Sequence, residues 1–320
     1  GDQMGLRMTY RFFISLLFFL LAQTVSADSL TLATLRADLG SGSLQPVLAR
    51  QTLVPVPDRV LARWVQDVDI EQFAITGFNE NRKRFAARIR LHFSDGGVGF
   101  LRLEGEPGAR YRLTEWYDYS SGLQLSELVS YGDRFQAGRG KAFLTMLQDN
   151  PGSAELADLA AGQPALLALW LVQCTGQPCE EQALAAQAET GKPALWQLKH
   201  ALMASDQNAY REISGQLHLA LGDDPYLWWL EGQLALSHQR CDWTHSPLRQ
   251  AWQRHTENRS LADVALQCHL VMSQRGTAFL DKLSEELGAD ALAMAIHRYY
   301  QQQDAAIPAI YRPWTQPGEK

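Results

Sequence analysis

Two carboxylates and a tyrosine near residue 117 are side chains of the types that carry out acid–base chemistry. Glu115, Asp118 and Tyr119 flank Trp116 in a stretch that we expect to be a strand. A carboxylate in an apolar cavity can act as a general acid or base, with tyrosine as a hydrogen-bond donor. Because side chains alternate along a strand, Glu115 and Asp118 are expected on opposite faces, so at most one enters a cavity. We favour solvated carboxylates, and we predict no catalytic residue and no enzyme.

Four cysteines are the next candidates for chemistry: Cys174, Cys179, Cys241 and Cys268. In an oxidising compartment an even number of cysteines favours disulfides. Cys174 and Cys179 are close enough in sequence to close a tight turn between helices, which leaves Cys241 to pair with Cys268. A zinc site is the alternative, but zinc motifs use two closely spaced cysteine pairs and this chain has one. We therefore predict disulfides.

The remaining motifs do not indicate a metal or a cofactor. None of the eight histidines has another histidine three or four residues away, and only His238 and His245, which flank Cys241, form a local cluster. The chain has neither a Gly-x-Ser-x-Gly elbow nor a His-Glu-x-x-His helix. The glycine-rich stretch 138–141 lacks the serine or threonine that a phosphate-binding loop requires after its lysine. We predict no cofactor.

The first 27 residues have the layout of a cleavable secretory signal. Arg11 precedes an apolar run at 12–22, and the small-residue exit Val25-Ser26-Ala27 follows. The apolar run is about half of the roughly 20 residues that a membrane-spanning helix needs. We expect cleavage near Ala27, no transmembrane segment in the mature chain, and a periplasmic or secreted protein.

Charge separates the mature chain into two halves. The formal net charge is −6, and no basic tract is present, so nucleic acid is not an expected partner. Residues 28–150 carry 15 basic and 15 acidic side chains, whereas residues 151–320 carry 12 and 19. The character of the sequence also changes at Asn150-Pro151-Gly152. We predict an α+β domain at 28–150, an all-α domain at 151–306 and a loose tail at 307–320.

The first domain is expected to be a curved antiparallel sheet with helices on one face. In Arg84–Phe93 the odd positions are apolar, as in a strand with one covered face, and Asp95-Gly96 follows as a hairpin turn. Short turns between neighbouring strands predict antiparallel pairing. The predicted helices are 29–39 and 57–67, and the predicted strands are 72–79, 84–93, 98–104, 110–119 and 123–130.

One apolar face of this sheet has two possible roles. If the sheet curls around it, the face lines a ligand pocket, and if helices cover it, the face is a filled core, which is the role we favour. The side chains concerned are Phe85, Ile89, Phe93, Leu101, Leu113 and Tyr117.

The second domain is expected to contain repeated helical hairpins. Similar phrases begin at Pro164, Pro193 and Pro225, and proline suits the first turn of a helix. Each phrase precedes a second helix-sized segment, and Pro247 is expected to begin a degenerate fourth unit. Trp228 and Trp229 point about 100° apart on a helix, so one can belong to the core while the other contacts a partner.

Two resemblances extend this interpretation. The run 111–122, followed by Leu125-Ser126-Glu127 and Phe135, resembles the closing strands of nuclear-transport-factor-2-like cone folds, in particular the periplasmic phospholipid-carrier family of the toluene-tolerance type. Over residues 70–148 this likeness implies a cone-like fold and a lipid or another apolar ligand. The helical half is similar to tetratricopeptide-type hairpins.

Together these features predict an exported, non-catalytic binding or scaffold protein of the cell envelope, whose helical repeats bind a protein or peptide. A carrier of a lipid or another apolar ligand in the α+β domain is the alternative. A cone-fold enzyme that uses Glu115 or Asp118 is the third hypothesis.

Overall fold

The computed structural model describes residues 29–53, 69–127, 138–150, 153–160, 164–173, 192–273 and 277–316. The expected signal sequence, the predicted helix 57–67, Cys174 and Cys179 lie outside these ranges. The chain divides into two compact units, one of residues 1–119 with 123–141 and one of residues 120–122 with 142–320. The boundary expected at Asn150 therefore lies near Lys141, because most of helix α6 (Gly138–Asp149) packs with the residues that follow it.

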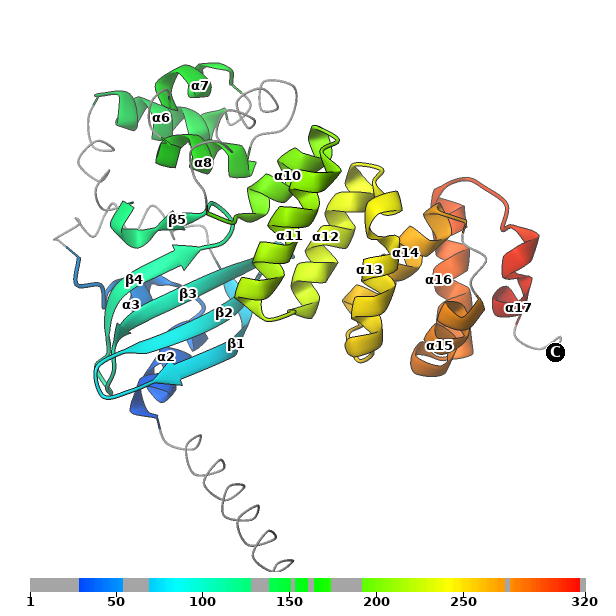
Figure 1. Cartoon of the computed structure of the whole chain (residues 1–320), viewed down its shortest axis with the longest axis horizontal. Helices are drawn as coiled ribbons and strands as arrows, with labels where there is room; N and C mark the ends of the chain where they lie inside the picture. Colours follow the sequence, from blue (N-terminus) through cyan, green and yellow to red (C-terminus); the bar gives the residue numbers. More distant parts are fainter. Residues whose placement is uncertain are drawn as a thin grey trace, which may run out of the picture. The chain divides into compact units, whose positions relative to one another are not determined.

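The first unit contains a five-stranded antiparallel sheet in the order β1-β2-β3-β4-β5 (Figure 1). The strands are β1 (Ile70–Glu80), β2 (Phe85–Phe93), β3 (Val98–Glu106), β4 (Arg112–Asp118) and β5 (Leu123–Gln124). The expected hairpin at Asp95-Gly96 is confirmed, since Gly96 has a φ of +87° and His92 pairs with Val98 across the turn. Neighbours in sequence are thus neighbours in the sheet.

The last predicted strand is wrong in its extent. Residues 123–130 were expected to be extended, but β5 has two residues and a helical turn begins at Leu125. The carboxylate of Glu115 accepts a hydrogen bond from the backbone N–H of Ser126 at 3.1 Å. That bond satisfies one of the donors that a helix leaves open at its N-terminus, which favours the helical turn over continued pairing.

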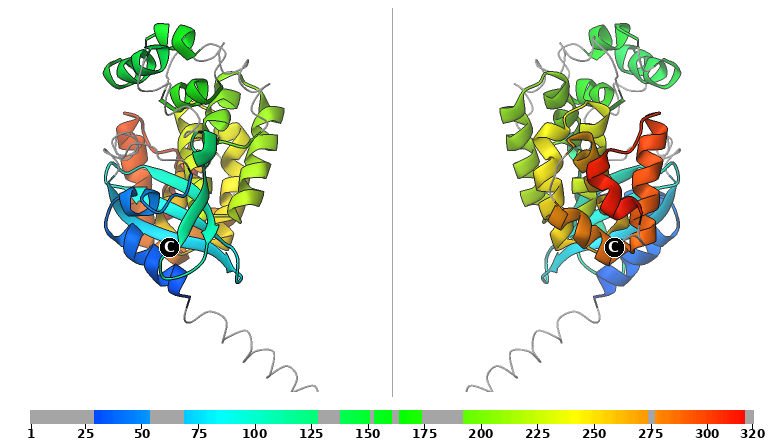
Figure 2. Two further views of the ribbon diagram at one scale, coloured as in Figure 1. Left: turned by 90° about the vertical axis from the view of Figure 1, so that its left-hand side faces the viewer. Right: turned by 90° about the vertical axis from the view of Figure 1, so that its right-hand side faces the viewer.

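Helices α2 (Leu30–Gly40) and α3 (Gln45–Leu48) cover one face of the sheet (Figure 2). The expected helix 29–39 is confirmed, with Ser29 as its N-cap accepting from the N–H of Leu32. Leucines of both helices join the odd-numbered residues of β2 in one core. Burial of this apolar face is the main stabilising contribution to the unit.

The second unit is helical, and it also includes the turn Ser120–Gly122, whose Ser121 carbonyl accepts from the indole N–H of Trp196 at 2.9 Å. After α6 its elements are α7 (Glu155–Ala160), α8 (Pro164–Gln173), α10 (Leu195–Met203), α11 (Gln207–Leu221), α12 (Pro225–Ser237), α13 (Cys241–Arg254), α14 (Arg259–Val271), α15 (Thr277–Leu287), α16 (Ala289–Gln302), η1 (Ala309–Tyr311) and α17 (Arg312–Thr315). None of the helices in the described ranges is both long and apolar enough to cross a membrane.

Of the four prolines that were predicted to begin helices, three lie at or just before a helix start and one lies inside a helix. Pro164 and Pro225 begin α8 and α12, as expected, and Pro193 precedes α10. Pro247 was expected to begin a further unit, but it lies inside α13. The preceding turn of α13 therefore continues through the proline, which removes one backbone hydrogen bond from the helix interior.

Helices α10, α12, α14 and α16 end in the same way. The residue after each C-cap has a left-handed backbone although it is not glycine: Ser205, Gln239, Ser273 and Asp304, with φ between 49° and 57°. These residues are 34, 34 and 31 positions apart. After three of the four, the next N–H bonds to a carbonyl five residues back, at 2.8 to 3.0 Å. This pattern is the Schellman motif, which satisfies open carbonyls at a helix end.

The C-terminal segment is not the loose tail that was expected. Residues 309–315 form η1 and α17, and Tyr311 is only 1% exposed in the helical core. Trp314 donates its indole N–H to Asp281 at 2.9 Å. Burial of its aromatic side chains stabilises this segment, although its prolines predicted an irregular tail.

Candidate binding surface and its supporting network

The two adjacent tryptophans of α12 have different surroundings. Trp228 stacks on the ring of His218, with centroids 3.8 Å apart and planes at 23°, and its indole N–H donates to Asp223 at 2.7 Å. Trp229 is half-buried, and its ring meets Tyr226 edge to face at 6.3 Å. Trp228 therefore belongs to an internal network, and Trp229 is the better candidate for a partner contact.

A buried carboxylate lies at the centre of that network. Glu231 is 1% exposed, and it accepts a hydrogen bond from the hydroxyl of Tyr210 at 3.0 Å. Its other oxygen makes a short contact with Nε2 of His218. Burial raises the pKa of Tyr210, and the nearby Glu231 charge raises it further, so the phenol remains a donor. Glu231 thus joins α12 to both ends of α11.

The exposed end of the network joins the same helices to α13. Asp223 occupies a left-handed position between α11 and α12, with a φ of +58°. Arg254 donates two hydrogen bonds to its carboxylate, both at 2.9 Å, and His255 lies 3.3 Å from it. The Arg254 hydrogen bonds are the main cause of a pKa of Asp223 well below its usual range. The whole arrangement fixes three helices relative to one another.

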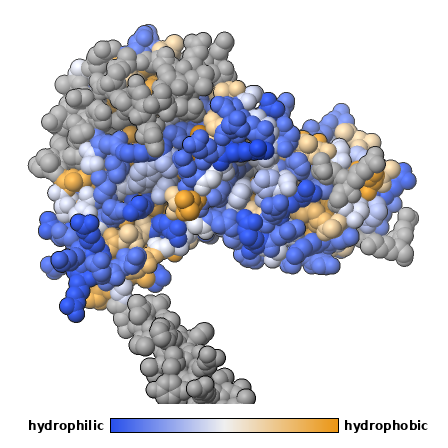
Figure 3. All heavy atoms as spheres, in the orientation of Figure 1, coloured by the Kyte–Doolittle hydropathy of each residue, from blue (hydrophilic) through white to orange (hydrophobic). Residues whose placement is uncertain are grey.

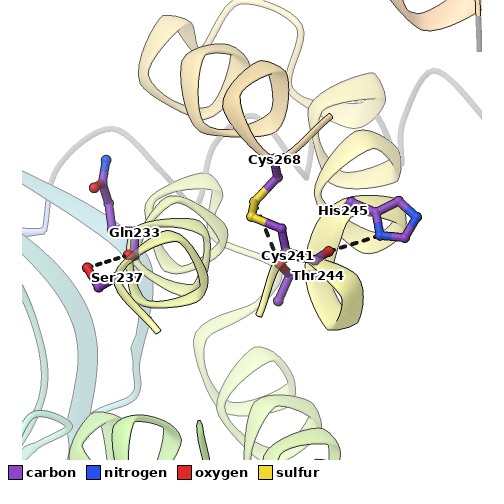
Figure 4. The surroundings of a disulfide bond; sticks show 6 residues. All are labelled: Gln233, Ser237, Cys241, Thr244, His245 and Cys268. Atoms are coloured by element: carbon purple, nitrogen blue, oxygen red, sulfur yellow. Dashed lines mark hydrogen bonds between the residues drawn. A yellow bond between two sulfur atoms is a disulfide. The ribbon is translucent and has the colours of Figure 1, made fainter. Parts of the chain in front are cut away.

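The predicted Cys241–Cys268 disulfide is present (Figure 4). It joins the first residue of α13 to α14, with a Cα–Cα distance of 5.2 Å. Nδ1 of His245 lies 2.9 Å from the Cys241 carbonyl oxygen, so this ring is bonded to the backbone. Within the described ranges no three histidine, cysteine or carboxylate side chains are grouped so that they could hold a metal ion.

The acid–base candidates of the sheet unit are held apart. Glu115 stands opposite Glu104 in the β3–β4 register, whereas Asp118 stands opposite Leu101. The Glu115 carboxylate accepts from two backbone N–H groups, those of Trp116 and Ser126. Tyr119 is buried, and burial raises its pKa. The structure gives Glu115 a capping role, and it places Glu115 and Asp118 opposite different residues of β3.

The proposed apolar pocket residues do not share one face. Phe85, Ile89, Leu101 and Leu113 lie in the core beneath α2 and α3, and Phe93 lies at its margin. Tyr117 is on the opposite face, because it pairs with Arg102 and Gln124 in register. Phe85 also lines an open depression of about 510 Å³, and most of the lining of that depression is polar: Asn79, Glu80, Asn81, Lys83, Arg84 and Glu106, among others.

Polar side chains recur on the first helices of the helical unit, and the sequence analysis did not single them out. Lys199 of α10, Gln233 of α12 and Gln267 of α14 are each half-exposed. Each lies six residues before the left-handed residue that ends its helix. The signal in the sequence was the 34-residue spacing of these positions.

Comparisons of the chain with protein-family models, with curated proteins and with solved structures found no match. What the protein does must therefore be inferred from the geometry of its own residues.

Proposed function

We propose that this is an exported, non-catalytic binding protein in which stacked helical hairpins hold a protein or peptide partner. The observation that carries the proposal is the constant 34-residue interval between Ser205, Gln239 and Ser273. A constant interval between identical helix ends is expected when one structural unit is repeated along a solenoid. Solenoids expose extended surfaces that suit macromolecular partners.

The packing of the first helices supports this repeat. A Cβ atom added to Gly232 of α12 would lie 2.8 Å from Cγ2 of Val264 on α14. Glycine at this point lets two first helices approach closely. α12 also packs against α10 and α13. The hairpins α10–α11 and α12–α13 are closely packed, and α14 packs against both helices of the second hairpin.

The proposed location rests on the leader sequence and on the disulfide. A disulfide between α13 and α14 suits the periplasm or the cell exterior, because cytosolic thiols are kept reduced. The alternative of a lipid carrier has less support, because four of the six expected pocket residues lie in a core that helices cover. The third hypothesis, an enzyme, lacks support because Glu115 is used as a cap.

Site-specific photocrosslinking in the native cell tests the proposal. A photoreactive phenylalanine derivative replaces Ser237, which is exposed on α12 one turn after Gln233, and the matched control replaces the exposed Glu212 on α11. We expect a discrete protein adduct from position 237 that is absent from position 212. Native mass spectrometry of the purified protein completes the test. A lipid mass on the protein without any protein adduct would refute the proposal.

A further inference from the structure

We infer that the partner segment is an extended acidic peptide held by a row of hydrogen-bond donors, Lys199, Gln233, Gln267 and Arg298, which we call the donor ladder. This inference rests on the proposed function and names the chemistry of the partner. The four residues lie on α10, α12, α14 and α16, and all are half-exposed or exposed.

The positions of these residues place them in register. Each lies six residues before a left-handed helix end, at Ser205, Gln239, Ser273 and Asp304. An α-helix turns by about 100° per residue, so equal offsets from equal caps give equal heights and equal directions around each helix. The shared cap geometry therefore gives the four positions the same height and the same direction on their helices.

The spacing of the first three ladder members suits an extended chain. α10 packs on α12, and α12 packs on α14 with the close approach at Gly232. Packed helix axes are about 8–10 Å apart. An extended chain advances about 3.3–3.6 Å per residue, so one step of the ladder matches about three residues of partner. In the polyproline-II form of an extended chain, which has three residues per turn, every third residue faces the same side, so a bound segment in that form would present an acceptor group to the ladder at every third position.

The chemistry of the ladder differs from that of the surface around it. The half of the chain from residue 151 carries seven more acidic than basic side chains, yet every member of the ladder is an N–H donor. The two end members are cationic and the two middle members are amides. Gln267 also donates to Asp263 on its own helix, at 2.9 Å, which orients its amide. Carbonyl and carboxylate oxygens complement such a row, and charge assistance strengthens the bonds at its ends.

Other features fit a polar mode of recognition. Hydrophilic residues predominate on the face of the molecule drawn in Figure 3, and the hydrophobic ones occur in small groups. Burial lowers the pKa of Lys199, and His238 lies close enough to be affected by its charge. An arriving carboxylate would offset both effects, because an anion favours the charged form of each. Trp229, on the same helix as Gln233, would supply an apolar contact beside the ladder.

Fluorescence anisotropy with defined probes tests the inference. The probes are fluorescein-labelled twelve-residue peptides, (Glu-Ser-Gly)4 and (Lys-Ser-Gly)4, titrated with the full chain. We expect saturable binding of the acidic probe that weakens with salt, and no binding of the basic probe. The Gln233→Ala plus Gln267→Ala variant should raise the Kd for the acidic probe by about 10-fold or more, since two hydrogen bonds are lost.

A matched variant separates the ladder from general effects of losing amides. Gln216→Ala plus Gln253→Ala removes two exposed glutamines from the second helices α11 and α13 and should leave the Kd unchanged. Equal binding of both probes, equal weakening by both variants, or no binding of either probe would overturn the inference. The crosslink from position 237 decides the proposed function separately. An adduct without acidic-probe binding means a partner of different chemistry, and the absence of an adduct from position 237 rejects both ideas.

Discussion

Each unit of the protein contains a buried or nearly buried carboxylate that accepts a hydrogen bond from a tyrosine. The two carboxylates differ in their second partner, which is an arginine in one unit and a histidine in the other. In the sheet unit Asp38 accepts from Tyr111 at 2.7 Å and from Arg50 at 2.6 Å. In the helical unit Glu231 is paired with Tyr210 and His218. Arginine is always charged and its side chain here is 26% exposed, whereas His218 is more deeply buried.

The two clusters also differ in the length of chain that they join. Asp38 and Tyr111 are 73 residues apart, so their bond ties α2 to the strand end across the whole sheet unit. Glu231 lies 21 residues from Tyr210 and 13 from His218, within neighbouring helices. The comparison shows that a buried carboxylate has a different structural role in each unit. In the sheet unit it joins segments that are far apart in the chain, and in the helical unit it joins neighbouring helices.

Removal of Glu231 is expected to have the largest effect. Glu231→Ala leaves Tyr210 and His218 buried without their acceptor, so the free energy of unfolding should fall by about 3–5 kcal/mol. Urea unfolding followed by tryptophan fluorescence measures this, because seven of the nine tryptophans belong to the helical unit. The exposed Asp263→Ala on α14 is the control and should change stability by less than about 0.5 kcal/mol.

The same deletion in the sheet unit sharpens the comparison. Asp38→Ala should cost less than Glu231→Ala, because Arg50 is partly exposed and can reach water once its partner is gone. Hydrogen exchange of the β2 and β3 amides measures the stability of the sheet unit. An equal or larger cost for Asp38→Ala would show that burial of the partner does not determine the difference between the clusters.

The disulfide provides the second-largest effect, and it should act on one unit only. In the chain-entropy view, Cys241→Ala plus Cys268→Ala restores freedom to a loop with a sequence separation of 27, at a cost of about 3.5 kcal/mol. The tryptophan transition should move to lower urea while exchange of the sheet amides stays unchanged. A parallel loss of protection in both units would mean that the two units unfold together.

Acid should weaken the helical unit through His200. Burial lowers the pKa of this residue to about 4, with the charge of Lys199 as a smaller cause, whereas the unfolded residue has a pKa near 6.5. Between these values the unfolded chain binds a proton that the folded chain does not. The free energy of unfolding should therefore fall by up to about 3 kcal/mol from pH 6.5 to pH 4, and this contribution should level off below pH 4.

The matched histidine variants isolate this contribution. His200→Gln should flatten the pH dependence over that range, whereas the exposed His297→Gln should leave it as in the parent chain. Urea unfolding at several pH values measures both. If His200→Gln kept the full pH dependence, the titrating group would lie elsewhere in the helical unit.

Patterns along one element were predictable from the sequence. The alternation in Arg84–Phe93 identified β2, and Asp95-Gly96 identified its hairpin, because strand period and turn chemistry are local properties. The C-terminal segment was missed because its prolines suggested irregular structure while Tyr311 is buried by distant helices. The last strand was predicted too long, at 123–130 instead of Leu123–Gln124, because the cap that ends it comes from Glu115, on another strand.

The candidate site was only partly predictable for a similar reason. Trp228 and Trp229 are both partly buried against the helical core, and the Glu231 network requires three side chains from two helices to converge. A repeat was predicted from the proline phrases at the helix starts, which are 29 and 32 residues apart. The left-handed residues at the helix ends are 34, 34 and 31 residues apart, and their conformation is a backbone property that the residue types Ser, Gln, Ser and Asp do not reveal.

Two glycines give the smallest predicted effects and test how rigid each unit is at a close contact. A Cβ atom at Gly105 would lie 2.0 Å from the backbone oxygen of Arg112, and one at Gly232 would lie 2.8 Å from a methyl group of Val264. Backbone has to move in the first case and only a side chain in the second. Gly105→Ala should therefore cost about 2–3 kcal/mol and Gly232→Ala about 1 kcal/mol, each measured in its own unit.

A third glycine and one double variant complete that test. Gly215 of α11 has nothing within 4 Å of an added Cβ, so Gly215→Ala should stabilise the helical unit by about 0.5–1 kcal/mol through helix propensity alone. Val264→Ala should remove part of the penalty of Gly232→Ala, because it deletes the methyl group 2.8 Å from the added Cβ but keeps the Cβ of residue 264, which would lie 3.0 Å away. If the double variant were no better than the sum of the single ones, the close approach of α12 and α14 would be fixed by backbone packing, and the spacing of the donor ladder with it.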